Sequence, residues 1–423
     1  MELSEKQSPT NIALRKKLAS LTDTDYRDWF LCLKARYGMA VVFQSIFDTY
    51  GSGDIITSPY TCITAVNPIL AGHLRPLYAD IFPENLQINP ESAKTILTER
   101  TYGLVMQHTL GIIGDKQSLI SFAKEHKLLL IEDSAHCLTR CARDKQQSIV
   151  SDISIHSFGV EKILTGTKFG GAVYLNPRLK NTHKALYDRL ITHFRSLPAP
   201  SSSLAFRLKT YRYQNAVLQR LPHSVRPSLR NFLIKAKLLE PAIYPEEQEG
   251  QQASPVASNQ FVEEVALSNI KTLKSNYHQR SQNVAYYHSH LNNHPSFDVL
   301  TNVNEPLLAY PILFKSAASA TSAYAALNSS GFFIRRWYSP LLFPGPTSNR
   351  IYHYHPRSLK IAESIHPRVL CLPTDLTKAQ LEQIVKILKP SAPVENAVEN
   401  IDTFPQSSQS SSKTTSNQPQ KDN

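Results

Sequence analysis

The chain has 423 residues, which is long enough for two or three domains. Hydrophobic residues make up 41% of it and charged residues 19%, and this balance excludes a collagen, a long coiled coil and a fully disordered chain. The formal net charge of +12 indicates an acidic partner without naming one. Apolar runs all fall short of the roughly 18 residues of a membrane-spanning helix, so we expect no such helix.

The five cysteines are odd in number and scattered along the chain. We therefore expect free thiols, and with them a cytoplasmic protein. Cys137 and Cys141 lie close together but lack a second pair of ligands. His353 and His355 alternate as on one strand face, again without a third ligand at suitable spacing. We predict no metal site.

Short apolar runs alternate with helical patterns between residues 54 and 176, after an expected N-terminal arm over residues 1–27. The expected strands cover residues 55–56, 76–80, 101–106, 128–133, 152–157 and 171–176, and the expected helices residues 36–47, 61–71 and 116–127. Alternation of helices with continuously apolar strands predicts an α/β fold, with a mostly parallel central sheet and helices on both faces. In such a sheet the chemistry lies at the carboxyl ends of the strands.

We expect a large α/β domain over residues 28–300 and a smaller C-terminal α+β domain over residues 301–390. In the smaller domain, apolar runs are expected at 307–314, 332–338 and 369–373, with helices at 316–330 and 378–389. The tail over residues 391–423 is rich in Ser, Gln, Asn and Pro, a composition that predicts disorder.

A basic helical insertion is expected over about residues 190–250. Between residues 189 and 237 it has ten Lys or Arg residues and no acid. We predict a weak contact with an anionic membrane surface and no binding of nucleic acid. Four residues form the expected lipid-facing side: Phe206, Leu208, Leu218 and Leu221. The alternatives are a substrate funnel and a solvated basic lobe.

Polar groups gather at the ends of two expected strands. Asp133 ends one strand and His136 follows it, and Ser157 ends the next strand, with Lys162 five residues further on. The glycines at positions 166, 170 and 171 indicate a tight turn or a closely approached backbone. Taken singly, the aspartate could be a helix cap, the lysine a surface residue and the histidine a core residue.

Together these residues suit pyridoxal phosphate. A lysine desolvated near a sheet has a lowered pKa and can form a Schiff base with a carbonyl. A carboxylate such as Asp133 can hold the pyridine nitrogen protonated, and His136 can contact the ring. Ser157 and the backbone N–H groups where the helix around Gly38 and Met39 opens can bind the phosphate.

Five segments occur in an order typical of one enzyme family. They are GSGDIITSPYTCITAVNPILAGHLRPLYADI (51–81), NLQINPESAKTILTERTYGLVMQHTLG (85–111), LLLIEDSAH (128–136), SIHSFGVEKILTGTKFGGAVYLN (154–176) and RVLCLPT (368–374). In this order and spacing they resemble the DegT/DnrJ/EryC1/StrS family of sugar aminotransferases, which are pyridoxal-phosphate enzymes of fold type I.

The resemblance implies a role for each matched residue. Lys162 becomes the Schiff-base lysine, Asp133 the partner of the pyridine nitrogen and His136 a contact of the ring. The remaining implied roles are phosphate binding by Ser157, Gly38 and Met39, and substrate contact by His108, Trp337 and Tyr338. Met39 departs from the family's hydroxyl or guanidinium, and Cys62 from its stacking aromatic residue.

The implied reaction transfers an amino group, with glutamate as the donor, to a keto sugar that is nucleotide-linked. A sister group that replaces the lysine with histidine dehydrates sugars, and Lys162 favours transamination. The rivals are a pyridoxal-phosphate dehydratase or epimerase, and a degenerate family member that acts as a binding module. The family also implies a homodimer, in which the partner subunit completes the site.

Overall fold

The computed structural model describes residues 8–114, 116–164, 166–222, 224–300, 305–345 and 347–389. The described residues up to Leu388 belong to one compact unit. The predicted disordered tail over residues 391–423 lies outside the described residues.

A seven-stranded sheet forms the centre, in the order β1-β7-β6-β5-β4-β2-β3. Its strands are β1 (Trp29–Cys32), β2 (Asp54–Thr57), β3 (Arg75–Tyr78), β4 (Thr101–Gln107), β5 (Leu129–Ser134), β6 (Ile153–Ser157) and β7 (Gly171–Leu175). The strands from β3 to β6 run parallel, whereas β7 is antiparallel to both β6 and β1. The predicted fold class is confirmed, although the short edge strand β1 was not predicted.

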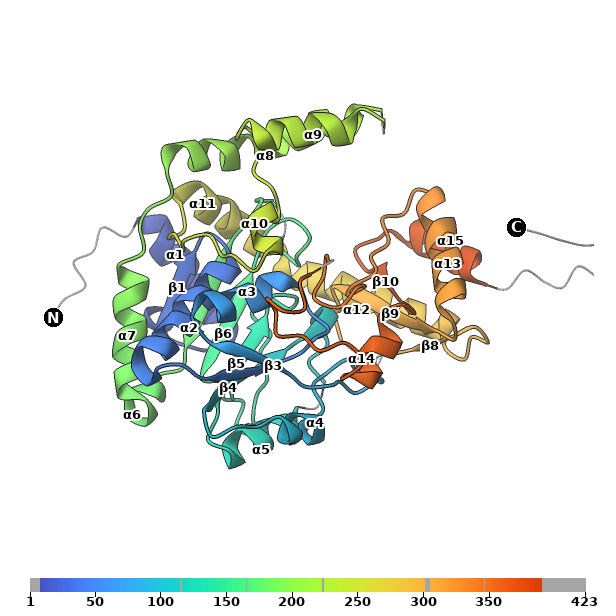
Figure 1. Ribbon diagram of the computed structural model, residues 1–423. Helices are drawn as coiled ribbons and strands as arrows, with labels where there is room; N and C mark the ends of the chain where they lie inside the picture. Colours follow the sequence, from blue (N-terminus) through green and yellow to red (C-terminus); the bar gives the residue numbers. More distant parts are fainter. Residues whose placement is uncertain are drawn as a thin grey trace, which may run out of the picture. The chain divides into compact units, whose positions relative to one another are not determined.

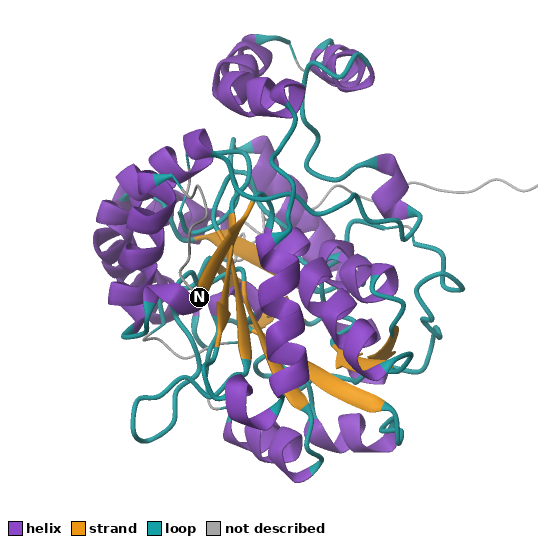
Figure 2. Ribbon diagram, turned by 90° about the vertical axis from the view of Figure 1, so that its left-hand side faces the viewer, coloured by secondary structure: helices purple, strands orange, loops and turns teal. Residues whose placement is uncertain are grey.

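Helices cover both faces of this sheet (Figures 1 and 2). They are α1 (Pro9–Thr22), α2 (Ala35–Tyr50), α3 (Ile63–Ala71), α4 (Pro90–Thr95), α5 (Gln117–Glu125), α6 (Leu179–Thr182), α7 (Lys184–Arg195) and α11 (Gln260–Asn269). Strand β4 shows the two faces: Val105 packs in the cluster with α2 and α7, and Leu104 and Met106 pack in the cluster with α5. This alternation is the period of two expected of a strand.

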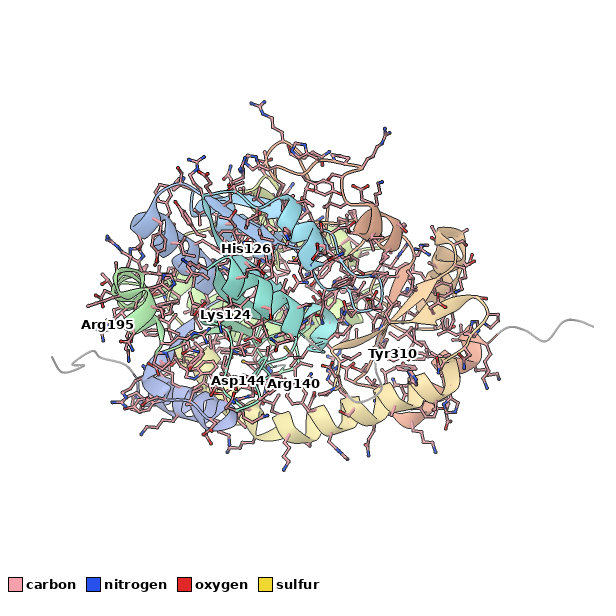
Figure 3. All side chains as sticks on the ribbon, turned by 90° about the horizontal axis from the view of Figure 1, so that it is seen from below. Lys124, His126, Arg140, Asp144, Arg195 and Tyr310 are labelled. Atoms are coloured by element: carbon pink, nitrogen blue, oxygen red, sulfur yellow. The ribbon has the colours of Figure 1, made fainter. Side chains whose placement is uncertain are left out.

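A three-stranded antiparallel sheet follows, in the order β10-β9-β8. Its elements are β8 (Phe297–Val299), β9 (Ala309–Phe314), β10 (Val369–Pro373), α12 (Leu273–Leu291), α13 (Ala317–Ser329), α14 (Lys360–Ile365) and α15 (Lys378–Leu388). Helix α12 connects the two sheets (Figure 3): its Tyr277 lies beside Arg140, and the ring of its Tyr287 lies 5.3 Å from that of Tyr310. The expected apolar run at 332–338 contributes only one bridge, between Arg335 and Cys371.

The expected insertion is helical. It contains α8 (Ser202–Arg220), α9 (Arg226–Lys235) and α10 (Pro245–Gln248), and Figure 1 shows α8 and α9 above α10 and α11. The expected lipid-facing side is wrong in two of its residues, because Leu208 and Leu218 are buried. The exposed apolar residues of α8 are Phe206, Tyr213 and Val217. Throughout the part of the chain that the structure describes, the helices are too short or too polar to cross a membrane.

Candidate active site

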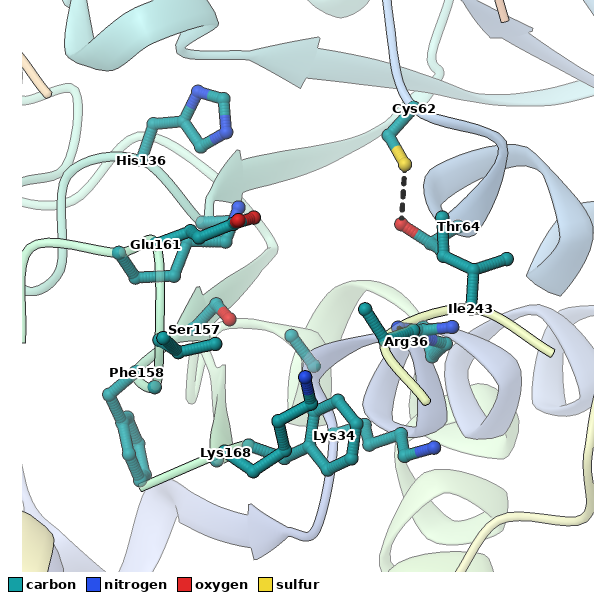
Figure 4. A pocket seen from close by; sticks show the side chains of 18 of the residues that line it. Lys34, Arg36, Cys62, Thr64, His136, Ser157, Phe158, Glu161, Lys168 and Ile243 are labelled. Carbon is teal, nitrogen blue, oxygen red and sulfur yellow. Dashed lines mark hydrogen bonds between the residues drawn. The ribbon is translucent and has the colours of Figure 1, made fainter. Parts of the chain in front are cut away.

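A pocket of about 580 Å³ opens at the carboxyl ends of β4, β5 and β6. The parallel strands bring His108, Asp133 and Ser157 to this edge of the sheet. Of the nine residues predicted for the site, eight line the pocket: Met39, His108, Asp133, His136, Ser157, Lys162, Trp337 and Tyr338. Gly38 does not line it. Figure 4 shows His136 and Cys62 across the pocket from Lys34 and Lys168.

Asp133 and Lys162 influence each other's protonation in this pocket. Asp133 is the last but one residue of β5, and its Oδ1 accepts the Ala135 N–H at 3.0 Å. Burial raises the pKa of Asp133, while the Ala135 N–H and the charge of Lys162 oppose that rise. Burial likewise lowers the pKa of Lys162, and Asp133 opposes that change. The site therefore holds an amine with a lowered proton affinity beside a carboxylate with a raised one, as acid–base chemistry near neutral pH requires.

His136 is held as a neutral imidazole. Its Nδ1 accepts the backbone N–H of Leu110 at 3.0 Å, so its Nε2 carries the proton toward the Tyr338 hydroxyl at 3.3 Å. Burial and the charges of Lys162 and Arg335 lower the pKa of His136 well below its ordinary value. The Trp337 ring lies against the His136 ring, with centroids 5.3 Å apart and planes 14° apart. The predicted aromatic segment thus packs directly on the residue expected to contact the cofactor ring.

His108 is paired with an acid that the sequence analysis did not assign. Its Nε2 lies 2.6 Å from Oε1 of Glu132, which is fully buried. Burial alone would raise the pKa of Glu132. Hydrogen bonds from His108, the Ala142 N–H and Ser151 outweigh that effect and hold the pKa at about 2. The signal in the sequence was the pair of adjacent acids in LLLIED, of which only Asp133 had been used.

The helix that is expected to bind a phosphate begins one residue earlier than predicted. Helix α2 starts at Ala35, so the unpaired N–H groups of its first turn that reach the pocket belong to Ala35 and Arg36. The Gly38 N–H already bonds within the helix, to the Lys34 carbonyl at 3.4 Å. A Cβ at Gly38 would lie 2.4 Å from Val173 Cγ2, so this glycine lets α2 approach β7. The structure therefore does not bring Gly38 to the pocket, and the buried Met39 side chain offers no phosphate donor.

Gly171 has a similar role at the same corner. A Cβ there would lie 2.5 Å from the Ala35 nitrogen. Gly171 pairs with Ser157 across β7 and β6, which places the Ser157 hydroxyl near the start of α2. The predicted close approach at the glycine cluster thus occurs where the phosphate donors gather.

The insertion supplies residues of the pocket, in line with the substrate funnel that was one alternative to the expected membrane contact. Helices α8 and α9 contribute five polar ones: Tyr211, Asn215, Gln219, Arg226 and Arg230. The buried Glu240 joins α8 to the segment that precedes α2: it accepts from Lys34 at 3.2 Å and from Arg207 at 3.1 Å. The one available signal was the run of cations without acids, because cations gathered on one face suit an anion.

Comparisons with known proteins show the family to which the chain belongs. The sequence profile of the DegT/DnrJ/EryC1/StrS aminotransferase family matches residues 39–193 and 261–389. The GDP-perosamine synthase of Vibrio cholerae is 32% identical over 123 residues, which are 29% of this chain and 33% of that protein. Matches to the curated relatives span only 30% to 39% of those proteins' lengths.

Solved structures share the fold over most of the chain. The aminotransferase PseC of Helicobacter pylori, which is involved in the biosynthesis of pseudoaminic acid, superposes with a TM-score of 0.67. The match has 17% identity and covers 91% of this chain and 92% of PseC. NtdA of Bacillus subtilis, solved with bound PMP, gives a TM-score of 0.65 at 17% identity, covering 90% of this chain and 78% of NtdA.

Proposed function

Because the chain belongs to the DegT/DnrJ/EryC1/StrS aminotransferase family, we propose that it is a pyridoxal-phosphate-dependent aminotransferase. The proposed acceptor is a keto sugar that is nucleotide-linked, and the proposed donor is glutamate. The observation that carries the proposal is the pair Asp133 and Lys162, which face one pocket with their pKa values shifted in opposite directions. No observation favours the dehydratase, the epimerase or the binding module.

The residues of the pocket fit the cofactor. Asp133 suits a pyridine nitrogen, because a buried carboxylate beside it keeps that nitrogen protonated. The Ser157 hydroxyl and the first N–H groups of α2 suit a phosphate. The volume of about 580 Å³ lies in the range of sites that enclose a cofactor-sized ligand.

The cofactor supplies an electron sink for the carbon that loses its proton. The chain's own residues would do the rest. Lys162 would bind the cofactor covalently and then, as a free amine of lowered pKa, move the proton of the donor's α-carbon. Asp133 would hold the ring-nitrogen proton, and His136, fixed by Leu110 and Tyr338, would hold the ring in place.

The test is spectroscopic and then kinetic. Purified protein supplied with pyridoxal phosphate should show the visible absorbance of the lysine-bound cofactor, and Lys162→Ala should lose it. Exposed Lys235→Ala is the matched control. Glutamate and glutamine are then offered with a panel of nucleotide-linked keto sugars. Amino transfer supports the proposal, whereas a protein that stays colourless, or one that only dehydrates the sugar, refutes it.

We also propose a homodimer, as the family resemblance implies. Sedimentation at micromolar concentration should give twice the monomer mass. A monomer that remains fully active would refute this part of the proposal and leave the reaction untouched.

A further inference from the structure

One end of the pocket is built by the insertion, within residues 194–260, which the family profile does not match. Helix α8 presents Tyr211, Asn215 and Gln219, each four residues apart and therefore on one helix face. Helix α9 presents Arg226 and Arg230, one turn apart. The end of the pocket formed by the insertion is thus polar and basic.

The cations around the pocket differ in their partners. Lys34 pairs with Glu240, and Arg36 pairs with Glu247 at 2.5 Å. Within the ranges that the structure describes, no carboxylate oxygen comes within 4.0 Å of the side-chain nitrogens of Lys168, Arg226 or Arg230. The neutralised cations flank the start of α2, whereas Arg226 and Arg230 lie on α9 of the insertion and Lys168 lies beside Tyr211 of α8.

Lys168 is the most telling of these three. It is only 4% exposed, and its ammonium lies 3.4 Å from the Tyr211 hydroxyl and 4.4 Å from the centroid of the Tyr211 ring. Burying a cation without a counter-ion is costly, so such a group marks a place where an anion binds. The exposed Glu161 lines the same pocket but forms no ion pair with it.

Arg226 is already oriented. Its Nη2 donates to the carbonyls of Gln219 and Leu221, at 2.8 and 3.0 Å. Its Nε is buried and, among the described residues, has no hydrogen-bond partner. A donor fixed in position with an unused N–H is suited to an oxyanion, because guanidinium groups match the geometry of phosphate oxygens.

We propose that Lys168, Arg226 and Arg230 form a phosphate-ester subsite that the insertion completes within the same chain. The ester is carried either by the cofactor or by the diphosphate of a nucleotide-linked substrate. Three unneutralised cations exceed what one carboxylate of an amino donor needs. The choice of ligand rests on the proposed function, whereas the subsite itself rests on the three side chains.

The experiment uses Arg230→Ala and Lys168→Met. Arg230 is exposed, so we expect Arg230→Ala to keep the fold. Thermal unfolding checks that Lys168→Met is folded as well. Lys235→Ala is the control, because Lys235 is an exposed cation on α9 that does not line the pocket. One arm titrates the protein with pyridoxal phosphate and with pyridoxal. A second titrates the holoenzyme with uridine, guanosine and thymidine diphosphates and their nucleosides.

Loss of a charge-assisted hydrogen bond should weaken binding of the phosphorylated probe by roughly tenfold to a hundredfold. If the variants bind pyridoxal phosphate more weakly than the wild type does, and bind pyridoxal equally well, the ester is that of the cofactor. If the variants bind a nucleoside diphosphate more weakly than the wild type does, and bind the nucleoside equally well, the ester is that of the substrate. Unchanged affinities in both arms of both variants overturn the subsite.

A third titration, with inorganic pyrophosphate on the protein as purified, separates this inference from the proposed function. Pyrophosphate binding that depends on Arg230, in a protein that takes up no cofactor, would refute the aminotransferase and keep the subsite. Amino transfer that is unaffected in Arg230→Ala and Lys168→Met would keep the aminotransferase and refute the subsite.

Discussion

The pocket has two unlike walls. The sheet wall carries Asp133 at the end of β5 and Ser157 at the end of β6, and backbone ladders on both sides fix these strands. The insertion wall carries Arg226 and Arg230 on α9, in a stretch outside the family match, and Glu240 joins the insertion to Lys34, just before α2.

This difference separates the residues expected to carry the reaction from those expected to select the ligand. Groups that move protons must hold their positions closely, and strand ends provide that rigidity. Groups that choose among ligands can lie on an appended segment, because their task is to complement a shape and a charge. A shared sheet wall with a distinct insertion wall therefore fits a common reaction with an individual substrate.

The largest effect is expected from a substitution in the sheet wall. Asp133→Asn should keep the cofactor but lose turnover, because an amide cannot hold the ring-nitrogen proton. The barrier should rise on the order of several kcal/mol, at about 1.4 kcal/mol per tenfold in rate. Turnover and cofactor absorbance are measured together. Near-normal turnover would show that another group serves the ring nitrogen.

The next largest effect is expected from a substitution that weakens the attachment of the insertion. Glu240→Gln leaves Lys34 and Arg207 without their buried carboxylate, and loss of one partner of a buried pair costs about 3 kcal/mol. Urea unfolding should show this loss of stability. Glu246→Gln, an exposed acid nearby, serves as the control and should change stability little. Equal midpoints for the two variants would contradict the anchoring role of Glu240.

A third effect concerns pH. Burial, reinforced by Arg230, lowers the pKa of Lys168 from 10.5 to about 8. The unfolded chain therefore binds more protons between these two pKa values, and stability should rise with pH from about 8 to 10.5. Below pH 8 the full penalty applies, so Lys168→Met should gain about 3 kcal/mol of stability at pH 7 in the apoprotein and lose the part of the alkaline rise that Lys168 contributes. Urea midpoints that follow the wild type across this range would contradict the lowered pKa.

The smallest effect tests the outer surface of the insertion. The predicted membrane contact stays a prediction, and its test now uses the exposed Lys209 and Arg212, because Arg207 is engaged with Glu240. Each cation near an anionic surface contributes about 1 kcal/mol. Wild type should sediment weakly with anionic vesicles at low salt, and a variant with both residues changed to Glu should not. Absence of binding by the wild type would end the membrane hypothesis.

The sequence predicted the residues of the sheet wall, but for the insertion it gave a substrate funnel only as an alternative and named no pocket residues. Asp133, Ser157 and Lys162 could be predicted because each lies at, or shortly after, the end of a recognisable buried strand. The sequence predicts phosphate donors around Gly38 and Met39, whereas the free N–H groups of α2 belong to Ala35 and Arg36, because a glycine at position 38 serves close packing on β7 as readily as a phosphate turn. Neither the burial of Lys168 nor the pocket-facing side of α9 could be predicted, since both depend on contacts between segments far apart in the chain.

Leu208 and Leu218 show the same limit from the apolar side. Periodicity identified a helix in the insertion, but it does not tell which face another segment covers. Both leucines are buried, and Tyr213 and Val217 are exposed in their place. A stripe of apolar residues thus predicts a helix more reliably than it predicts what the helix contacts.

The weak burial of helix α9 has a consequence for local unfolding. Helix α9 has no fully buried residue in its described span, so the insertion has little apolar surface with which to resist opening. Segments with few buried contacts open before the core does, and a protease cuts the open form. Cleavage between α8 and α9 should therefore precede unfolding of the sheet. A ligand that bridges both walls would slow that cleavage in proportion to its occupancy, so protease resistance becomes a measure of ligand binding that needs no enzymatic assay.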